Sequence, residues 1–306
     1  MHRHAVKWIL WPAILAPMCC GCRGPAGVST RTKLPGPPPV VKEATQEELL
    51  DKYNQMAKGV NSVNATVELR PTAGSKYSGI IEEYHEVKAF LLADRPAAIR
   101  VIGQVPVIGT TVFDMTSDGE TFRVHIPSKN KFLVGPISSE RASGKPLENL
   151  RPQHLLDALL WPEIRKEEPV LLEEFGDETG RYYVLTVLRG GRRLEILRKI
   201  WFNRSDLQVS RLQGYGPKGV LLADIHESSW EPLTADQQSS PAGTSNGIPA
   251  FPRSIRIERP HDDYRLDLDI TKLSLNEEIP RERFTLEQPA GSELVPVGSG
   301  AESKQP

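Results

Sequence analysis

The sequence has 306 residues, with 38 Lys and Arg against 39 Asp and Glu, so its formal net charge is -1 at pH 7. This balance excludes a strongly basic nucleic-acid-binding protein and an acidic disordered chain. Gly (24) and Pro (26) are frequent, which favours a strand-rich and turn-rich fold over a helical bundle. No stretch approaches the roughly 20 apolar residues of a membrane-spanning helix, which excludes a multi-span membrane protein.

The first 21 residues have the pattern of an export signal. Basic residues between positions 2 and 7 are followed by a short apolar run, and all three cysteines, Cys19, Cys20 and Cys22, stand at its end. We therefore expect residues 1–21 to be removed from the mature protein. The clustering of the cysteines argues against a disulfide framework, and no later cysteine could complete a thiolate metal site.

This segment resembles a bacterial lipoprotein signal, in which a small residue precedes the cysteine that is lipidated. Gly21 before Cys22 fits that pattern best, with Cys20 and Cys19 as alternatives because Cys19 replaces the usual upstream leucine. The resemblance implies several acyl chains on one cysteine, which is enough for stable membrane attachment. We expect a membrane-tethered protein, and plain secretory cleavage is the alternative.

The mature chain begins with a linker and then a helix. Residues 22–44 are rich in Pro and Gly, which predicts an extended spacer. Thr45 and Glu48 have the spacing of a capping box, and apolar residues recur behind them at helical intervals up to position 60. A second short helix is predicted from Pro152 to Trp161.

Period-two alternation dominates the rest of the chain. Apolar and polar residues alternate at 63–69, 99–103, 122–126, 255–258 and 264–270, and a phase slip near Thr271 predicts a β-bulge. One apolar and one wet face are typical of an antiparallel sheet. We expect an α+β, mostly β, domain over residues 45–290, with a mobile loop at 233–250 and a disordered tail at 291–306. Its single curled antiparallel sheet would form a half-open β-barrel, with the helices as a lid over an apolar cavity.

An ordered series of weak motifs carries a family resemblance over residues 46–290. They are the leading helix and first strand at 47–69, the strand start at 94–100 (Asp94–Arg95–Pro96 and the four residues up to Arg100), the hairpin 114–122, the middle helix 149–161, and the closing strands at 224–230 and 252–255. Together they resemble the periplasmic lipoprotein carrier and outer-membrane lipoprotein receptor family (LolA/LolB-like). The resemblance implies a half-open barrel that binds acyl chains of lipoproteins and performs no catalysis, with no catalytic residue, cofactor or metal.

Two groups of residues follow as candidate sites. The receptor branch carries an apolar hairpin tip that dips into the membrane, and Val105, Val107 and Ile108 stand at the matching place; the alternative is that they pack inward as ordinary strand residues. The acyl cavity is predicted to be lined by Ile99, Val101, Phe122, Val124, Leu266 and Leu268.

These expectations describe an outer-membrane lipoprotein that faces the periplasm and helps to deliver lipoproteins to that membrane. Its partners would be acylated lipoproteins, a periplasmic carrier and the membrane itself, with no nucleic acid, and the protein would be a monomer. The alternative is a structural or assembly lipoprotein of the cell envelope whose sheet binds a protein partner and no lipid.

Signals for enzymatic chemistry are weak. Residues 214–219 match a dinucleotide-binding glycine pattern by letters, but a strand follows them where a helix is needed, so we interpret them as a turn. No metalloprotease or nucleophile-elbow motif occurs. His261 and Asp262 read as a polar hairpin tip. Arg193 and Arg198, each within a basic pair, could face anionic headgroups or form a wet sheet face.

Overall fold

The computed structural model describes residues 40–75, 80–83, 85–137, 152–191, 193–239 and 248–297. The predicted signal, its three cysteines and most of the linker lie outside these residues. The described residues belong to one compact unit. No helix within the described ranges is long and apolar enough to cross a membrane.

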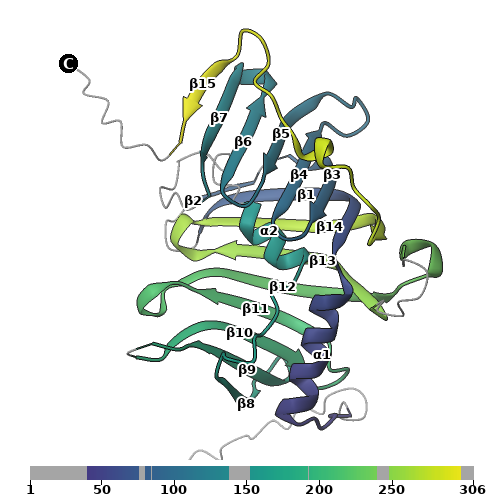
Figure 1. Cartoon of the computed structure of the whole chain (residues 1–306), viewed down its shortest axis with the longest axis vertical. Helices are drawn as coiled ribbons and strands as arrows, with labels where there is room; N and C mark the ends of the chain where they lie inside the picture. The colour runs from purple at the N-terminus through teal and green to yellow at the C-terminus, as the bar shows by residue number, and fades with distance from the viewer. Residues whose placement is uncertain are drawn as a thin grey trace, which may run out of the picture. The chain divides into compact units, whose positions relative to one another are not determined.

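One mixed sheet of fifteen strands dominates the unit (Figure 1). Its strand order is β15-β7-β6-β5-β4-β3-β1-β14-β13-β12-β11-β10-β9-β8, and β2 pairs with β1 beside this path. The strands are β1 (Ser62–Ser75), β2 (Ile80–Glu83), β3 (Val87–Asp94), β4 (Ala98–Gln104), β5 (Thr111–Ser117), β6 (Thr121–Ile126), β7 (Lys131–Pro136), β8 (Val170–Gly176), β9 (Arg181–Arg189), β10 (Glu195–Asn203), β11 (Val209–Tyr215), β12 (Leu221–Pro232), β13 (Ala250–Arg259), β14 (Tyr264–Leu275) and β15 (Glu293–Pro296).

Two α-helices, α1 (Gln46–Gly59) and α2 (Pro152–Leu159), lie on one face of this sheet (Figure 1). Thr45 caps α1: its side chain accepts from the Glu48 N–H and the Glu48 carboxylate accepts from the Thr45 N–H, so the predicted capping box is confirmed. Short 3-10 turns join several strands: η1 (Pro127–Lys129), η3 (Pro217–Gly219), η4 (Ala235–Gln237), η5 (Pro260–Asp262) and η6 (Arg281–Phe284). The 214–219 glycine segment is a strand end and turn, as predicted.

Register in the centre of the sheet follows the hydrophobic alternation. β1 pairs with β14 over eleven partners from Val63↔Leu275 to Ala73↔Tyr264, and the register shifts between Thr66 and Val67. That shift lies opposite Thr271, so the predicted β-bulge is confirmed. The residues with inward phase on these strands are buried, and they join the apolar faces of α1 and α2 in one hydrophobic core.

The barrel expectation is wrong in one respect: the fold is mostly β and the sheet is open, as predicted, but the sheet is not strongly curled. Closure requires the first and last strands to pair. Here β8 pairs with β9 and β15 with β7, so within the described residues both remain edges. The two helices and close-packed side chains cover the apolar face of the sheet. The sheet therefore does not have to curl further to shield this face from water.

The predicted C-terminal tail also needs correction over residues 291–297. β15 pairs in parallel with β7, from Glu293↔Lys131 to Pro296↔Val134, which makes the sheet mixed. A four-residue strand offers too little alternation to be recognised in the sequence. In the predicted mobile loop, Gln238 bridges to Leu275 and Ile248 is buried, so both described ends of that loop are fixed.

Candidate functional site

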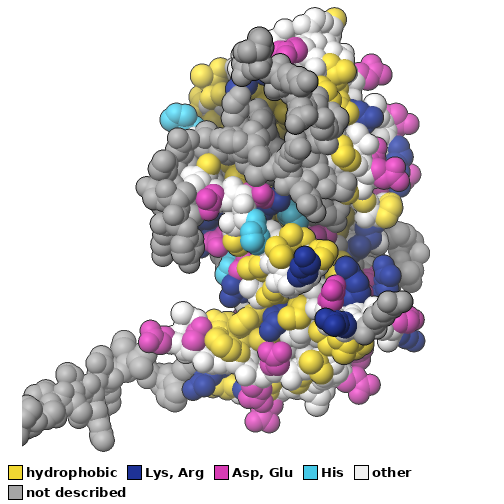
Figure 2. Space-filling view, turned by 90° about the vertical axis from the view of Figure 1, so that its left-hand side faces the viewer, with side chains coloured by type: hydrophobic (Ala, Val, Ile, Leu, Met, Phe, Trp, Pro, Cys, Tyr) yellow, Lys and Arg dark blue, Asp and Glu magenta, His cyan; other side chains and the backbone are white. Residues whose placement is uncertain are grey.

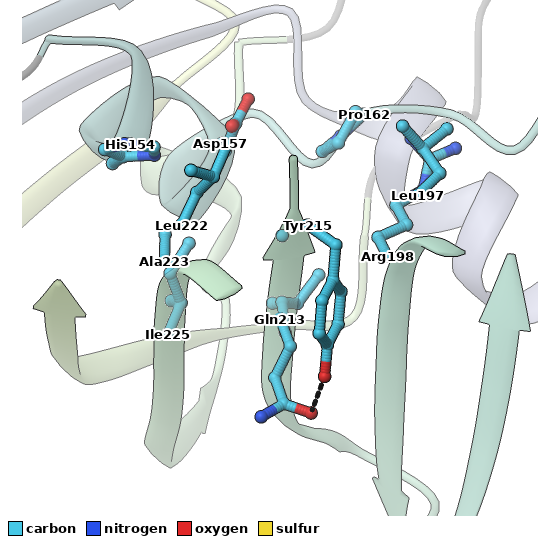
Figure 3. Close-up of a pocket in the computed structure, with 12 residues that line it drawn as sticks. His154, Asp157, Pro162, Leu197, Arg198, Gln213, Tyr215, Leu222, Ala223 and Ile225 are labelled. Atoms are coloured by element: carbon cyan, nitrogen blue, oxygen red, sulfur yellow. Dashed lines mark hydrogen bonds between the residues drawn. The ribbon is translucent and has the colours of Figure 1, made fainter. Parts of the chain in front are cut away.

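A pocket of about 320 Å³ lies where α2 and the segment after it face β10, β11 and β12 (Figure 3). This volume is at the lower end of the roughly 300–1,000 Å³ of small-molecule sites. The lining residues are His154, Asp157, Pro162, Leu197, Arg198, Leu212, Gln213, Gly214, Tyr215, Leu222, Ala223 and Ile225. Most of this surface is apolar, so the pocket suits a hydrocarbon guest better than a charged one.

Gly214 leaves the space that makes the pocket. A Cβ atom built on Gly214 would meet no atom within 4 Å, although the residue lies inside β11 between paired strands. The neighbouring walls, Leu212, Ala223 and Ile225, are buried, whereas Leu222 is 43 % exposed at the mouth. A glycine inside a strand marks a place where something approaches the backbone closely. Here the open side of Gly214 faces the pocket.

Arg198 and Tyr215, two polar residues that line the pocket, make hydrogen bonds, although Arg198 Nε is buried without a partner among the described residues. Arg198 donates from Nη2 to the Glu163 carbonyl at 2.7 Å and to Glu168 Oε2 at 2.9 Å. The Tyr215 hydroxyl donates to Gln213 Oε1 at 3.3 Å (Figure 3). The charge of Arg198 is therefore balanced by Glu168, and the pocket offers hydrocarbon contact in preference to an ion site.

Arg95 holds the two helical segments together. Its guanidinium, on the β3–β4 turn, donates to the carbonyls of Ala57 (2.7 Å) and Val60 (3.0 Å) at the end of α1. It also donates to the carbonyls of Leu160 (3.2 Å) and Trp161 (3.0 Å) just after α2. A cation at the C-terminus of a helix satisfies its free carbonyls and interacts favourably with its dipole. One side chain thus fastens both helices to the sheet.

A second link joins α1 directly to the segment after α2. Asn54 accepts from the Ile164 N–H at 2.9 Å and donates to the Ile164 carbonyl at 3.1 Å. With the Arg95 contacts, this makes α1, α2 and residues 160–164 a single covering layer. We call this layer the lid.

Beneath the lid, Trp161 meets a buried carboxyl group. The Trp161 indole N–H donates to Glu227 Oε1 at 2.7 Å, and burial raises the pKa of Glu227 to about 8 although this hydrogen bond lowers it. The Trp161 ring stacks on Trp230 and lies 5.3 Å from Phe251, measured between ring centroids. Glu227 Oε2 and the Tyr53 hydroxyl have no hydrogen-bond partner among the described residues. Two buried polar atoms at the contact between the lid and the sheet are therefore left without a hydrogen bond.

The apolar tip between β4 and β5 projects into solvent. Val107 is fully exposed and Ile108 is 77 % exposed, whereas Val105 is 37 % exposed. The turn is closed by hydrogen bonds from the Val105 N–H to the Thr110 carbonyl and from the Gly109 N–H to the Val105 carbonyl. Val107 has a φ of 71°, a region that β-branched residues rarely adopt. The turn therefore holds two apolar side chains outward at a conformational cost.

The six residues predicted to line an acyl cavity lie elsewhere in the fold. Ile99, Val101, Phe122, Val124, Leu266 and Leu268 are each at most 2 % exposed and belong to the common hydrophobic core. The pocket beside α2 is formed by a different set of residues. The three candidate lipidation cysteines lie outside the described residues. Within the described residues, no group of three or more His, Cys, Asp or Glu side chains could hold a metal ion.

Sequence reasoning missed the pocket, Arg95 and Glu227. Arg95 stands in the strand-start motif 94–100, but its partners are main-chain carbonyls more than 30 residues away. Glu227 breaks the apolar phase of β12, since it is a charged residue only 4 % exposed at the inward position after Ile225. That phase violation was the available signal for a buried ionisable group.

Solved structures to which this chain is similar include the following three. A LolA superfamily protein from Nitrosomonas europaea is 16 % identical, with a TM-score of 0.49, and the match covers 80 % of this chain and 99 % of that one. A domain described as an outer membrane lipoprotein-sorting protein, from Vibrio parahaemolyticus, is 12 % identical (TM-score 0.48, covering 78 % and 94 %). A DUF1329 family protein from Desulfovibrio piger is 15 % identical (TM-score 0.48, covering 78 % and 96 %).

Comparisons by sequence give no relatives: no protein-family model matches this chain, and no curated protein matches it. The likeness to solved structures concerns the fold alone.

Proposed function

We propose that this protein binds acyl chains of lipoproteins and helps to deliver them to the outer membrane, to which it is anchored by lipid on Cys22 (or on Cys20 or Cys19). The observation that carries the proposal is the apolar pocket of about 320 Å³ beneath a lid that one arginine fastens. Burial of hydrocarbon would drive binding, at about 0.8 kcal/mol for each CH₂ group removed from water.

The pocket would receive the first part of an acyl chain, and lid movement would admit the rest. Release of the Arg95 hydrogen bonds would loosen α1 and α2 without breaking any strand pairing, because its four acceptors lie in the lid or at Val60, which directly follows α1. The Asn276 bond to the Gly59 carbonyl and the Trp161 bond to Glu227 would have to open as well. The predicted cavity residues Ile99, Val101, Phe122, Val124, Leu266 and Leu268 belong to the hydrophobic core that the lid helps to cover, and they would become guest contacts once it lifts.

The exposed β4–β5 tip supports the delivery step. Val107 and Ile108, together with Val105, would enter the interface of the membrane that receives the lipoprotein, since exposed apolar side chains gain free energy there. The linker of residues 22–44 would give the domain reach from its lipid anchor, and a periplasmic carrier would supply the acylated lipoprotein.

Solvent extraction of the purified full-length protein, followed by mass spectrometry of the lipid that is not covalently attached, tests the proposal. We expect about one acyl-chain-bearing molecule per protein. Lipid-free protein that also fails to bind an added acylated peptide would refute it.

A second candidate is a scaffold that binds a protein partner, and the β8 edge favours it. Leu171 and Phe175 on that strand are 53 % and 44 % exposed, and the outer side of β8 has no partner strand in the described residues. An extended peptide could add there as a further strand.

A further inference from the structure

Two hairpin turns meet beside the mouth of the pocket. Gly190, Gly191, Arg193 and Leu194 lie between β9 and β10, and residues 216–220 join β11 to β12. The pairing of β10 with β11 runs as far as Arg198↔Gly214, and β10 also contacts the η3 turn that follows β11. The two turns therefore lie next to each other at one end of the sheet.

Exposed apolar side chains gather on these turns. Leu194 is 62 % exposed, Leu222 is 43 % exposed and Val220 is 38 % exposed. Isolated exposed leucines are ordinary, but three large aliphatic side chains on two adjoining turns and at the start of β12 indicate a contact surface.

Basic residues surround this apolar group. Arg189, Arg193 and Lys218 are all exposed on the same two hairpins. Glu195, which lies across from Arg189 in the register, is the acidic residue at their base. Figure 2 faces this end of the sheet and shows yellow hydrophobic surface adjoining dark blue Lys and Arg surface. The next hairpin turn carries Asp262, which pairs with Arg259, and bounds the basic area.

The same surface is continuous with the pocket. Leu222 belongs to both, because it lines the pocket and is also exposed at its mouth. A guest that leaves the pocket past Leu222 would thus emerge beside Val220 and Lys218.

We propose that Leu194, Val220 and Leu222 with Arg193 and Lys218, the hairpin-tip surface, dock on an anionic lipid bilayer. The aliphatic side chains enter the boundary between headgroups and acyl chains, and the cations bind lipid phosphates. Docking there sets the pocket mouth against the bilayer, so hydrocarbon passes between them without crossing water. This inference rests on the proposed acyl-chain binding, and the surface is separate from the β4–β5 tip.

The test uses tryptophan fluorescence of the full-length protein in vesicles of phosphatidylcholine with one third phosphatidylglycerol. Leu194→Trp places a reporter on the hairpin-tip surface, and Leu294→Trp places a matched reporter on β15, where Leu294 is 55 % exposed. Spin-labelled lipid acyl chains should quench Leu194→Trp several-fold more strongly than Leu294→Trp. Equal quenching of the two reporters would overturn the proposal and would leave a protein partner as the occupant of this surface.

Charge reversal makes the lipid specificity measurable. In the Leu194→Trp protein, the changes Arg193→Glu and Lys218→Glu should each weaken docking on the anionic vesicles by about fivefold or more, because one basic residue contributes about 1 kcal/mol at such a surface. Quenching that is insensitive to both changes and to salt would contradict the proposed phosphate contacts.

Acyl-chain binding is measured separately with a fluorescent fatty acid in the absence of vesicles. Fatty-acid binding with equal reporter quenching refutes only the docking surface. Selective quenching of Leu194→Trp without fatty-acid binding refutes the proposed function and leaves a membrane contact site.

Discussion

The Trp161 indole N–H donates to Glu227 Oε1 at 2.7 Å, and both side chains are buried between the lid and β12. Because Trp161 follows α2 and its carbonyl also accepts from Arg95, this one residue connects the lid to the sheet twice. The buried carboxyl makes that connection sensitive to pH, since ionisation of Glu227 would place an unbalanced charge under the lid.

Glu227→Gln should remove a pH dependence of stability. The pKa of Glu227 is about 8 in the folded protein against 4.5 as its ordinary value, so its contribution is fully present below pH 4.5 and is lost as the pH rises toward 8. Between these values the parent should lose between about 1 and 2 kcal/mol of unfolding free energy per pH unit relative to the variant. Urea unfolding at pH 5 and pH 8 measures this. Glu231→Gln, on the exposed end of the same strand, is the control.

Arg95→Met should loosen the lid. The change deletes hydrogen bonds to four carbonyls, and loss of at least about 2 kcal/mol of unfolding free energy is expected. Hydrogen exchange should rise in the last turns of α1 and α2 but not in β1 or β14. Arg281→Met is the matched control, since Arg281 is 68 % exposed and makes a 3.7 Å ion pair with Asp94 beside the same turn. Similar exchange in both variants would contradict the clamp role of Arg95.

Gly214→Leu should fill the pocket. Its Cβ meets no neighbouring atom, so the domain should fold with unchanged or raised stability while fatty-acid affinity falls at least tenfold. Gly190→Leu adds the same side chain at another open glycine, which does not line the pocket, and should leave affinity unchanged. Titration with a fluorescent fatty acid compares the two. Undiminished affinity in Gly214→Leu would show that the guest binds elsewhere.

Ile108→Glu should separate binding from delivery. Since Ile108 is 77 % exposed, the change should alter unfolding free energy by no more than about 0.5 kcal/mol and leave fatty-acid binding intact. Transfer of an acylated lipoprotein to vesicles should slow, because the glutamate carries charge into the bilayer interface. Leu294→Glu, a change of the same kind on β15, is the control. Equal transfer rates in both variants would show that the β4–β5 tip has no role in delivery and only connects two strands.

Local sequence signals predicted local structure well. The capping box at Thr45, the bulge opposite Thr271 and the turn at 214–219 each depend on neighbouring residues, and the structure has all three. The helix predicted from Pro152 also forms, although it ends at Leu159. These features are governed by short-range sterics and hydrogen bonds that a single sequence displays.

Long-range features were not predictable in the same way. The alternation at Ile99 and Leu268 identifies an inward face, but it does not say whether side chains or a cavity fill the space behind it. The open ends of the sheet depend on which strands pair, and the pocket depends on a glycine lying opposite α2. The role of Arg95 in joining α1 and α2 could be recognised only from the structure, in which the ends of both helices lie at the β3–β4 turn. Its acceptors are backbone carbonyls, which carry no residue-specific signal in the sequence.

The pairing of β1 with β14 has a consequence for how the chain is made. Val63 of β1 pairs with Leu275 of β14, and β1 lies between β3 and β14 in the sheet. During synthesis, more than two hundred further residues must therefore be added after β1 before β14 is available to pair with it. The centre of the sheet can thus be completed only late in synthesis, and such long loop closure slows folding. Until then β1 presents an unpaired, apolar edge on the side that β14 later covers, and such edges promote aggregation.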